Sequence, residues 1–217
     1  MEKSERIESR HLSFKKSKII DRIAIFFIRT ISNYYWIIID ILSHNNKKLA
    51  DKYNKSIGNE YKKECKLLNI SKGDKILHIG CGSYPLTEMT LANLFDINIV
   101  GIDKNERAVQ RARKVIIKEK LQKKISINKG NGANYPVGSF DLIIVSGCAL
   151  PKNAILTHIF KKAKKNCNII IRDLEGAMED TINCINAHKN IHLEREIYHP
   201  SPSRYLLGWN AFHVKKR

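Results

Sequence analysis

Short apolar runs alternate with amphipathic segments along the chain from residue 72 to the C-terminus. A short continuous apolar run predicts a buried strand, and apolar residues that recur every three or four positions predict a helix. The expected strands are Lys75–Ile79, Ile97–Ile102, Ile125–Ile127, Phe140–Ser146, Asn168–Arg172, Ile191–Tyr198 and Leu206–Val214. The expected helices are Leu86–Phe95, Glu106–Lys118, Ala154–Lys164 and Met178–Ala187.

This alternation of strands and helices predicts an α/β fold, in which a doubly wound parallel sheet carries helices on both faces. Several of the expected strands contain continuous apolar runs, as strands covered on both faces do. The last two strands follow each other without a helix between them. A short connection of this kind predicts an antiparallel pair at one edge of the sheet.

The first 70 residues predict a helical extension, followed by the α/β domain at residues 71–217. The stretch from Ile19 to Leu42 is strongly apolar, but its longest charge-free run, Thr30–Ile39, is about half of what a membrane-spanning helix needs. The charged residues that interrupt the stretch are Asp21, Arg22, Arg29 and Asp40. We therefore expect no spanning segment, and residues 1–17 lack the apolar core of a signal peptide.

Two interpretations of this N-terminal stretch remain open. It forms one or two helices that pack on the α/β domain, or it lies on a membrane surface with its basic flanks against anionic lipid. A further, lysine-rich helix is expected from about Asn46 to Leu68, with an apolar stripe on one side.

The chain is strongly basic. Lysine and arginine number 39 against 21 aspartate and glutamate, which gives a net charge of +18. Residues 1–72 hold 16 basic and 8 acidic side chains, and residues 73–217 hold 23 and 13, so the excess is spread along the chain. This distribution is typical of a solvated basic surface, and it leaves binding to nucleic acid or to an anionic membrane open.

Five cysteines are scattered along the chain, at Cys65, Cys81, Cys148, Cys167 and Cys184. No pair has the spacing of a zinc site, and we expect no bound metal. An odd number of unclustered cysteines favours reduced thiols in the cytoplasm. A membrane-peripheral position stays open because of the apolar N-terminal stretch.

Candidate chemistry gathers after the first two strands of the α/β domain. Gly80-Cys81-Gly82 follows the first strand, and Asp103 ends the second. Ligands of such sheets bind outside the carboxyl ends of the strands. Gly80 and Gly82 allow a close backbone approach, and the Asp103 carboxylate can accept both hydroxyls of a ribose. The third glycine of a dinucleotide fingerprint is absent and Pro85 opens the next helix, which favours a nucleoside cofactor without pyrophosphate.

These residues carry a resemblance to a known family. Lys75–Gly82 (KILHIGCG) is similar to the first motif of class I S-adenosylmethionine-dependent methyltransferases, and Val100–Lys104 (VGIDK) to their acidic second motif. Phe140–Ile143 resembles the start of their fourth strand. The resemblance begins at about Asp74. It implies S-adenosylmethionine as the cofactor and a Rossmann-like sheet of seven strands, parallel except for one antiparallel strand.

The same resemblance implies places for further cofactor-binding residues. Ser83 and Tyr84 are expected beside the methionine part of the cofactor, and Asn131 near its adenine. Ser146 and Gly147, at the end of the fourth strand, are expected to face the sulfonium.

A narrower resemblance points to nicotianamine synthases, which use the same fold and cofactor but transfer the aminocarboxypropyl arm. Gly80–Thr87 (GCGSYPLT) is similar to their G-x-G-x-x-P-L-T segment, and Tyr198–Pro200 (YHP) to a C-terminal motif. Ile171–Ala177 (IRDLEGA) is similar to their arginine-containing fifth strand and the residues after it. The N-terminal part of this chain is much shorter than theirs.

Three residues are candidates for catalysis: Glu64, Tyr84 and Tyr198. Glu64 stands with Tyr61 on the helix before the α/β domain, where it either closes over the substrate or belongs to a solvated helix face. Tyr198 stands at the start of a proline-rich turn. No catalytic triad or pair of carboxylates stands out, which fits transfer from an activated cofactor, because the protein then mainly positions the reactants.

Three functions follow as hypotheses. The leading one is a methyltransferase that acts on an unidentified acceptor, most simply a small molecule. The second is a nicotianamine synthase-like enzyme that transfers the aminocarboxypropyl group to make a metal-chelating product. The third is a non-catalytic protein that binds nucleosides or RNA on the same scaffold.

Overall fold

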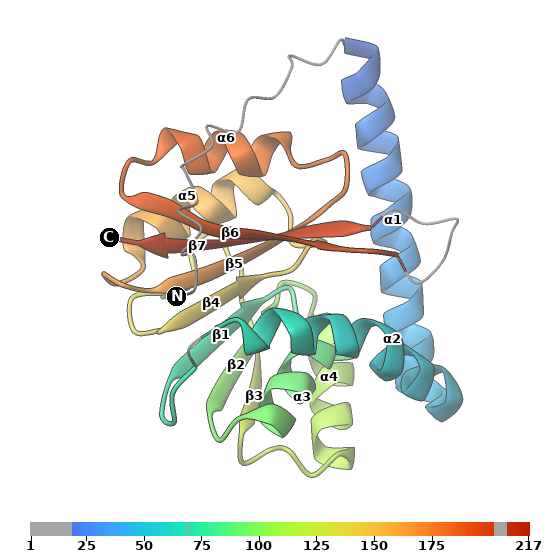
Figure 1. The fold of residues 1–217 in the computed structure, drawn as a ribbon. Helices are drawn as coiled ribbons and strands as arrows, with labels where there is room; N and C mark the ends of the chain where they lie inside the picture. The colour runs from blue at the N-terminus through green and yellow to red at the C-terminus, as the bar shows by residue number, and fades with distance from the viewer. Residues whose placement is uncertain (1–18, 69, 202–207) are drawn as a thin grey trace, which may run out of the picture.

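Seven strands form one mixed sheet in the computed structural model, which describes residues 19–68, 70–201 and 208–217. The strands are β1 (Lys75–Ile79), β2 (Asn98–Asp103), β3 (Ile125–Lys129), β4 (Leu142–Val145), β5 (Asn168–Leu174), β6 (Ile191–His199) and β7 (Trp209–Lys216). Their order is β3-β2-β1-β4-β5-β7-β6, and β7 runs antiparallel to both neighbours (Figure 1). This confirms the predicted Rossmann-like sheet with one antiparallel strand.

Helices cover both faces of the sheet. The apolar core on one face includes residues of α2 (Lys47–Lys66), α3 (Leu86–Leu94) and α4 (Glu106–Lys118). The core on the other face includes residues of α5 (Lys152–Lys162) and α6 (Glu179–Ala187). Successive strand residues point to opposite faces, so Ile76 belongs to the first core and Leu77 to the second.

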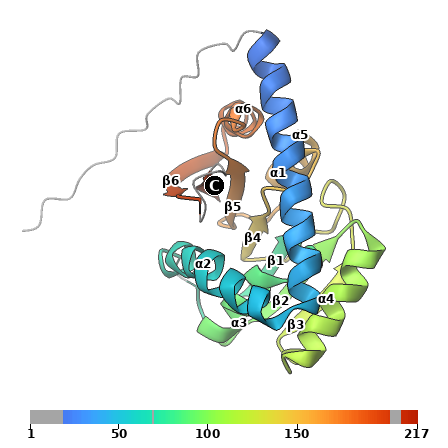
Figure 2. The same cartoon turned by 90° about the vertical axis from the view of Figure 1, so that its right-hand side faces the viewer.

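The N-terminal stretch forms one long helix, α1 (Ile19–Asn45), and not two. Figure 2 shows α1 running across the edge of the sheet at which the parallel strands end. It contacts α2 and α4, and Trp36 of α1 stacks on Tyr53 of α2. Asn46 ends the long helix and caps the next one, because its side chain accepts a hydrogen bond from the Leu49 N–H.

Part of the N-terminal stretch therefore packs on the α/β domain. In the described residues, no helix has the length and apolar character needed to cross a bilayer. The division of the chain at residue 70 stays a prediction, and the expectation for residues 1–17 lies outside the described residues.

The ends of three strands differ from the expected ones, and polar residues with hydrogen-bond partners lie at two of these ends. β4 is shorter than Phe140–Ser146, and at its start the Asp141 side chain accepts a hydrogen bond from the Lys75 N–H. β5 continues through Asp173 to Leu174. Asp173 is fully buried there, and its carboxylate accepts a hydrogen bond from the Thr181 hydroxyl. β7 begins at Trp209, and the expected start of this strand at Leu206 lies outside the described residues.

Candidate functional site

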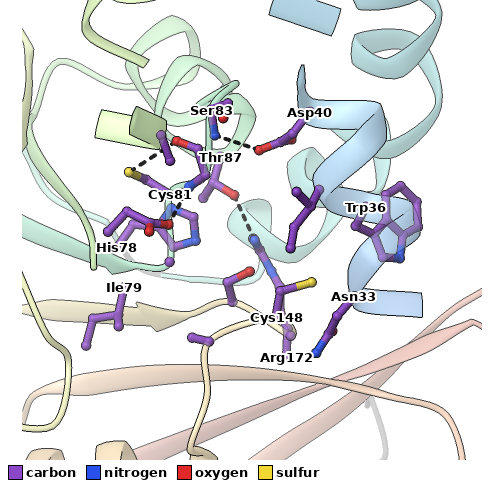
Figure 3. Close-up of a pocket in the computed structure, with 18 of the residues that line it drawn as sticks. Asn33, Trp36, Asp40, His78, Ile79, Cys81, Ser83, Thr87, Cys148 and Arg172 are labelled. Carbon is purple, nitrogen blue, oxygen red and sulfur yellow. Dashed lines mark hydrogen bonds between the residues drawn. The ribbon is translucent and has the colours of Figure 1, made fainter. Parts of the chain in front are cut away.

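A cavity of about 300 Å³ lies at the carboxyl ends of the parallel strands. Asn33, Trp36 and Asp40 of α1 form one wall, opposite the loops that follow the strands (Figure 3). The cavity gathers every residue predicted to bind the cofactor, which are Gly80, Gly82, Ser83, Asp103, Asn131, Ser146 and Gly147. Residues far apart in the sequence thus meet at one place, as the strand pattern predicted.

The loop after β1 has a backbone shape that favours glycine. The φ angles are +87° at Gly80 and +68° at Gly82, a region that other residues rarely adopt. The Gly82 N–H donates to the Asp103 carboxylate at 3.1 Å, and the other oxygen of Asp103 accepts from the Asn105 N–H at 2.8 Å. Asp103 therefore links the glycine loop to the start of α4 at the wall of the cavity.

Asp40 of α1 meets the same loop from the opposite side. Its Oδ2 accepts hydrogen bonds from the backbone N–H groups of Ser83 (2.8 Å) and Tyr84 (3.3 Å), just before α3. Pro85 stands at the cap position of α3 and offers no side-chain cap, and Asp40 instead accepts hydrogen bonds from the two backbone N–H groups that directly precede it. Burial raises the pKa of Asp40 to about 7, although the two N–H groups lower it.

Tyr84, a candidate for catalysis, lines the cavity with its phenol anchored on α2. The Asn54 side chain donates a hydrogen bond to the Tyr84 hydroxyl at 3.0 Å, and the Tyr84 ring lies 6.0 Å from the ring of Tyr53. Burial raises the pKa of Tyr84. The side chain is therefore a neutral phenol at physiological pH.

A buried lysine organises the loop after β4. The Lys152 ammonium, with 2% of the residue exposed, donates to the carbonyl oxygens of Ser146 at 2.7 Å and Gly147 at 3.4 Å. It also donates to the Arg172 carbonyl at 3.0 Å, which ties the end of β4 to β5. Asn131, after β3, stabilises its own turn by accepting from the backbone N–H two residues further on.

A buried ion pair lies beside the cavity. The Arg172 guanidinium contacts both oxygens of the Glu64 carboxylate, with the Nη2–Oε2 distance at 2.5 Å, and donates to the Thr87 hydroxyl at 2.8 Å. It also stacks on the ring of Tyr61, 3.7 Å from its centroid. Burial raises the pKa of Glu64, but Arg172 and His199 together outweigh this effect, and the pKa lies below its usual value. Glu64 is thus an ionised carboxylate.

Glu64 itself is not among the residues that line the cavity, whereas its partner Arg172 is. Tyr198 is also absent from the lining: 53% of it is exposed, and its hydroxyl donates to the Glu175 carboxylate at 3.2 Å. The neighbouring His199 is fully buried and stacks on Trp209, a cavity residue. The catalytic roles expected of Glu64 and Tyr198 stay predictions.

Two thiols, Cys81 and Cys148, line the cavity as well. Burial raises the pKa of Cys148 to about 12 and that of Cys81 well above its usual value. Both are therefore protonated and poor nucleophiles at neutral pH. Within the ranges that the structure describes, no three His, Cys, Asp or Glu side chains converge as metal ligands.

The sequence alone did not predict the contacts of three polar residues at or beside the cavity. Asp40 was interpreted as an interruption of an apolar stretch, although a single carboxylate in an amphipathic helix also signals a polar contact. Arg172 belongs to the IRDLEGA segment that carries the resemblance to nicotianamine synthases, but its pairing with Glu64 was not predicted, although a buried arginine requires a partner. Lys152 carried no signal, because a lysine at the start of a helix is commonly solvent-exposed.

Comparisons with known proteins relate the α/β domain of this chain to methyltransferase domains. Residues 70–213 match a family model described as a methyltransferase domain. A curated L-histidine 2-aminobutanoyltransferase from Yersinia pestis is 26% identical over 142 residues, which are 64% of this chain and 52% of that protein. A sterol 24-C-methyltransferase from Aspergillus fumigatus is 33% identical over 79 residues, 35% of this chain and 20% of that protein. The chain thus spans about half the length, or less, of these relatives.

Solved structures share the fold. A nicotianamine synthase variant (MtNAS) in complex with S-adenosylmethionine superimposes with a TM-score of 0.72 at 17% identity, over 92% of this chain and 80% of that one. A geranyl diphosphate C-methyltransferase from Streptomyces coelicolor A3(2) gives a TM-score of 0.62 at 6% identity, over 74% and 78%. The [4+2]-cyclase SpnF gives 0.60 at 12% identity, over 73% and 80%.

Proposed function

The chain belongs to the methyltransferase-domain family, and from this membership we propose that it is an S-adenosylmethionine-dependent transferase. One observation carries the proposal: the positive-φ loop of Gly80 and Gly82 is hydrogen-bonded to Asp103 at the wall of a cavity. This is the junction that the sequence assigned to a nucleoside cofactor.

The cavity residues fit such a cofactor. Each oxygen of Asp103 accepts one backbone N–H bond and keeps further acceptor capacity for the hydroxyls of a ribose. A Cβ at Gly80 would lie 3.1 Å from the side-chain carbons of Ser146 and Ala149, so glycine keeps the passage between these loops open. When bound, S-adenosylmethionine supplies a sulfonium that makes its attached carbons electrophilic, and the protein's part is mainly to position the reactants.

We propose that the transferred group is the 2-aminobutanoyl (aminocarboxypropyl) arm. The Yersinia pestis relative is named for this transfer, and the nicotianamine synthase structure aligns over 92% of this chain, against 74% for the geranyl diphosphate methyltransferase. The family model begins at residue 70, so the larger overlap includes helices before the domain. The GCGSYPLT and YHP segments also favour aminocarboxypropyl transfer over methyl transfer. The sequence alone had favoured methyl transfer.

Methyl transfer is the second candidate. The description of the family model and the sterol 24-C-methyltransferase relative favour it. The fold alone does not separate the two reactions, because one fold hosts many chemistries.

On the acceptor side, we propose an amine nucleophile of an amino acid. Tyr61 of α2, Arg172 of β5 and Trp209 of β7 line one part of the cavity, so an acceptor bound there would meet aromatic side chains and a cation. An ammonium group must lose a proton before it attacks a carbon. Asp40 is placed at the cavity wall with a pKa of about 7, which suits a group that accepts this proton near neutral pH.

Product analysis tests the proposal. The protein is incubated with S-adenosylmethionine and a panel of α-amino acids that includes L-histidine, and the mixture is resolved by mass spectrometry. We expect methylthioadenosine together with an acceptor heavier by one aminocarboxypropyl group. The Asp103→Ala variant serves as the control, because S-adenosylmethionine also releases methylthioadenosine without an enzyme.

The other outcomes decide between the alternatives. Adenosylhomocysteine with a methylated acceptor would establish the second candidate. Calorimetric binding of S-adenosylmethionine with neither product across a broad acceptor panel would favour the non-catalytic nucleoside-binding hypothesis. No binding would contradict the cofactor assignment itself.

We also propose a reducing, cytoplasmic compartment. All five cysteines are free thiols in the described structure, which is the usual state of cysteines in the cytoplasm.

A further inference from the structure

The outward face of α1 is apolar along most of its length. Of the thirteen large apolar side chains that are exposed in the described residues, nine belong to this helix. They are Ile23, Phe26, Phe27, Ile31, Tyr34, Tyr35, Ile37, Ile38 and Leu42, with exposed fractions from 37% to 67%. Such a concentration on one element marks an interaction surface, since isolated apolar residues on a surface are normal but a continuous patch is not.

These side chains form a continuous stripe. Most of them are three or four positions apart, so they share one side of the helix. The stripe runs from Ile23 to Leu42, about 28 Å at about 1.5 Å per residue. Figure 1 shows that the N-terminal part of α1, where this stripe begins, rises past α6.

The opposite side of the helix is more polar. The polar residues Ser32, Asn33 and Asp40 line the cavity together with the apolar residues Trp36, Ile37 and Ile41. Ile37 thus lies at the border between the stripe and the cavity. A helix on the surface of a water-soluble domain shows the reverse arrangement, with its apolar side inward and its polar side outward. This arrangement points to an apolar partner for the outer side of α1.

We propose that the outward face of α1 docks on an anionic lipid surface. The chain carries a net charge of +18. Residues 1–18, which lead into α1, carry six basic side chains and three acidic ones, a net charge of +3. Basic segments beside an apolar helix face attract anionic headgroups, while the apolar side chains enter the headgroup boundary. Phe26, Phe27, Tyr34 and Tyr35 are residues suited to that boundary.

Charge argues against a second copy of the chain as the occupant. Two copies paired through α1 would bring together two strongly basic molecules, including their basic N-terminal segments, and like charges repel. An anionic surface turns the same charge into attraction. Because α1 is also a wall of the cavity, docking would place the cavity about one helix diameter, roughly 10 Å, from the lipid.

Vesicle sedimentation with the full chain tests the proposal. Vesicles of equal parts phosphatidylglycerol and phosphatidylcholine are compared with vesicles of phosphatidylcholine alone. We expect binding to the anionic vesicles, weakened when salt rises from about 0.1 M to 1 M because the Debye length falls from about 10 Å to 3 Å. The double variant Phe26→Ser/Phe27→Ser is expected to bind at least roughly tenfold more weakly than the unmodified protein.

Ile117→Ser is the matched control. Ile117 lies on α4 with 62% of the residue exposed, outside the stripe, and its replacement should leave vesicle binding unchanged. Circular dichroism and thermal unfolding check that all variants keep the fold. Light scattering after size exclusion reports whether the protein is a monomer or a dimer.

Three results would overturn the proposal. The first is no binding to anionic vesicles at low salt. The second is binding that the Phe26→Ser/Phe27→Ser variant retains in full, because the general basic charge would then account for it. The third is a dimer that this variant dissolves while vesicles are not bound, because a second copy would then be the occupant.

Discussion

The ion pair between Glu64 and Arg172 joins α2 to β5, and its removal gives a measurable test of how the N-terminal helices are held. Arg172→Met leaves the Glu64 carboxylate, 1% exposed, without its main counter-charge. Removing one partner of a buried pair costs about 3–5 kcal/mol of unfolding free energy. At about 2–4 °C per kcal/mol for a chain of this size, the thermal midpoint should fall by about 6–20 °C.

The double variant Glu64→Leu/Arg172→Met distinguishes the cost of leaving one charge unpaired from the net contribution of the ion pair. Each single variant strands one buried charge, whereas the double variant removes both and fills the space with apolar atoms. Replacing a whole buried pair in this way is often close to neutral. We therefore expect the double variant to be more stable than the sum of the two single effects predicts, by at least about 2 kcal/mol.

The assay is urea unfolding of all four proteins, followed by circular dichroism and by tryptophan fluorescence. The slope against urea concentration should be the same for all of them, so that shifts of the midpoint report stability. Lys72→Met is the control, since the Lys72–Asp96 pair is exposed on both sides and its loss should leave the midpoint unchanged. Effects of the two single substitutions that add to within about 0.5 kcal/mol would refute the buried-pair argument.

Four further predictions concern the cavity. Asp103→Ala should weaken S-adenosylmethionine binding by about 1.5–3 kcal/mol, the scale of hydrogen bonds to charged groups; unchanged calorimetric affinity in a folded variant would remove the ribose assignment. Gly82→Val should abolish binding but keep the helix and strand content by circular dichroism, because φ is +68° there and the new side chain would clash with the Asp40 carboxylate; Cys81→Ser should bind and turn over normally, and loss of turnover would restore a role for the thiol. Asp40→Asn should flatten the pH dependence of stability. The pKa of Asp40 rises from 3.8 to about 7 on folding, so the folded state holds one more proton than the unfolded state between these pH values. The unfolding free energy of the unmodified protein therefore falls by up to about 4 kcal/mol as pH rises through that range. If the urea midpoint changed equally between pH 5 and pH 8 in the unmodified protein and in the Asp40→Asn variant, this prediction would be contradicted.

The sequence by itself determined the domain fold and the centre of the site. Continuous apolar runs predicted the strands, because a strand covered on both faces has no polar side. The helix Glu106–Lys118 was predicted with its observed ends. Gly80, Gly82 and Asp103 could be identified because their roles depend on local features: the backbone freedom of glycine and the position of a carboxylate directly after a strand.

The tertiary structure decided which distant side chains meet. Asp40 reaches the Ser83 N–H across 43 positions of sequence, and Glu64 reaches Arg172 across 108. No periodicity encodes such pairs, because a hydrophobic pattern reports burial and not the identity of the partner. That α1 turns its polar side to the cavity and its apolar side outward likewise follows from where the helix packs. Local propensity forms the helix in either orientation, and only its contacts with the domain select one.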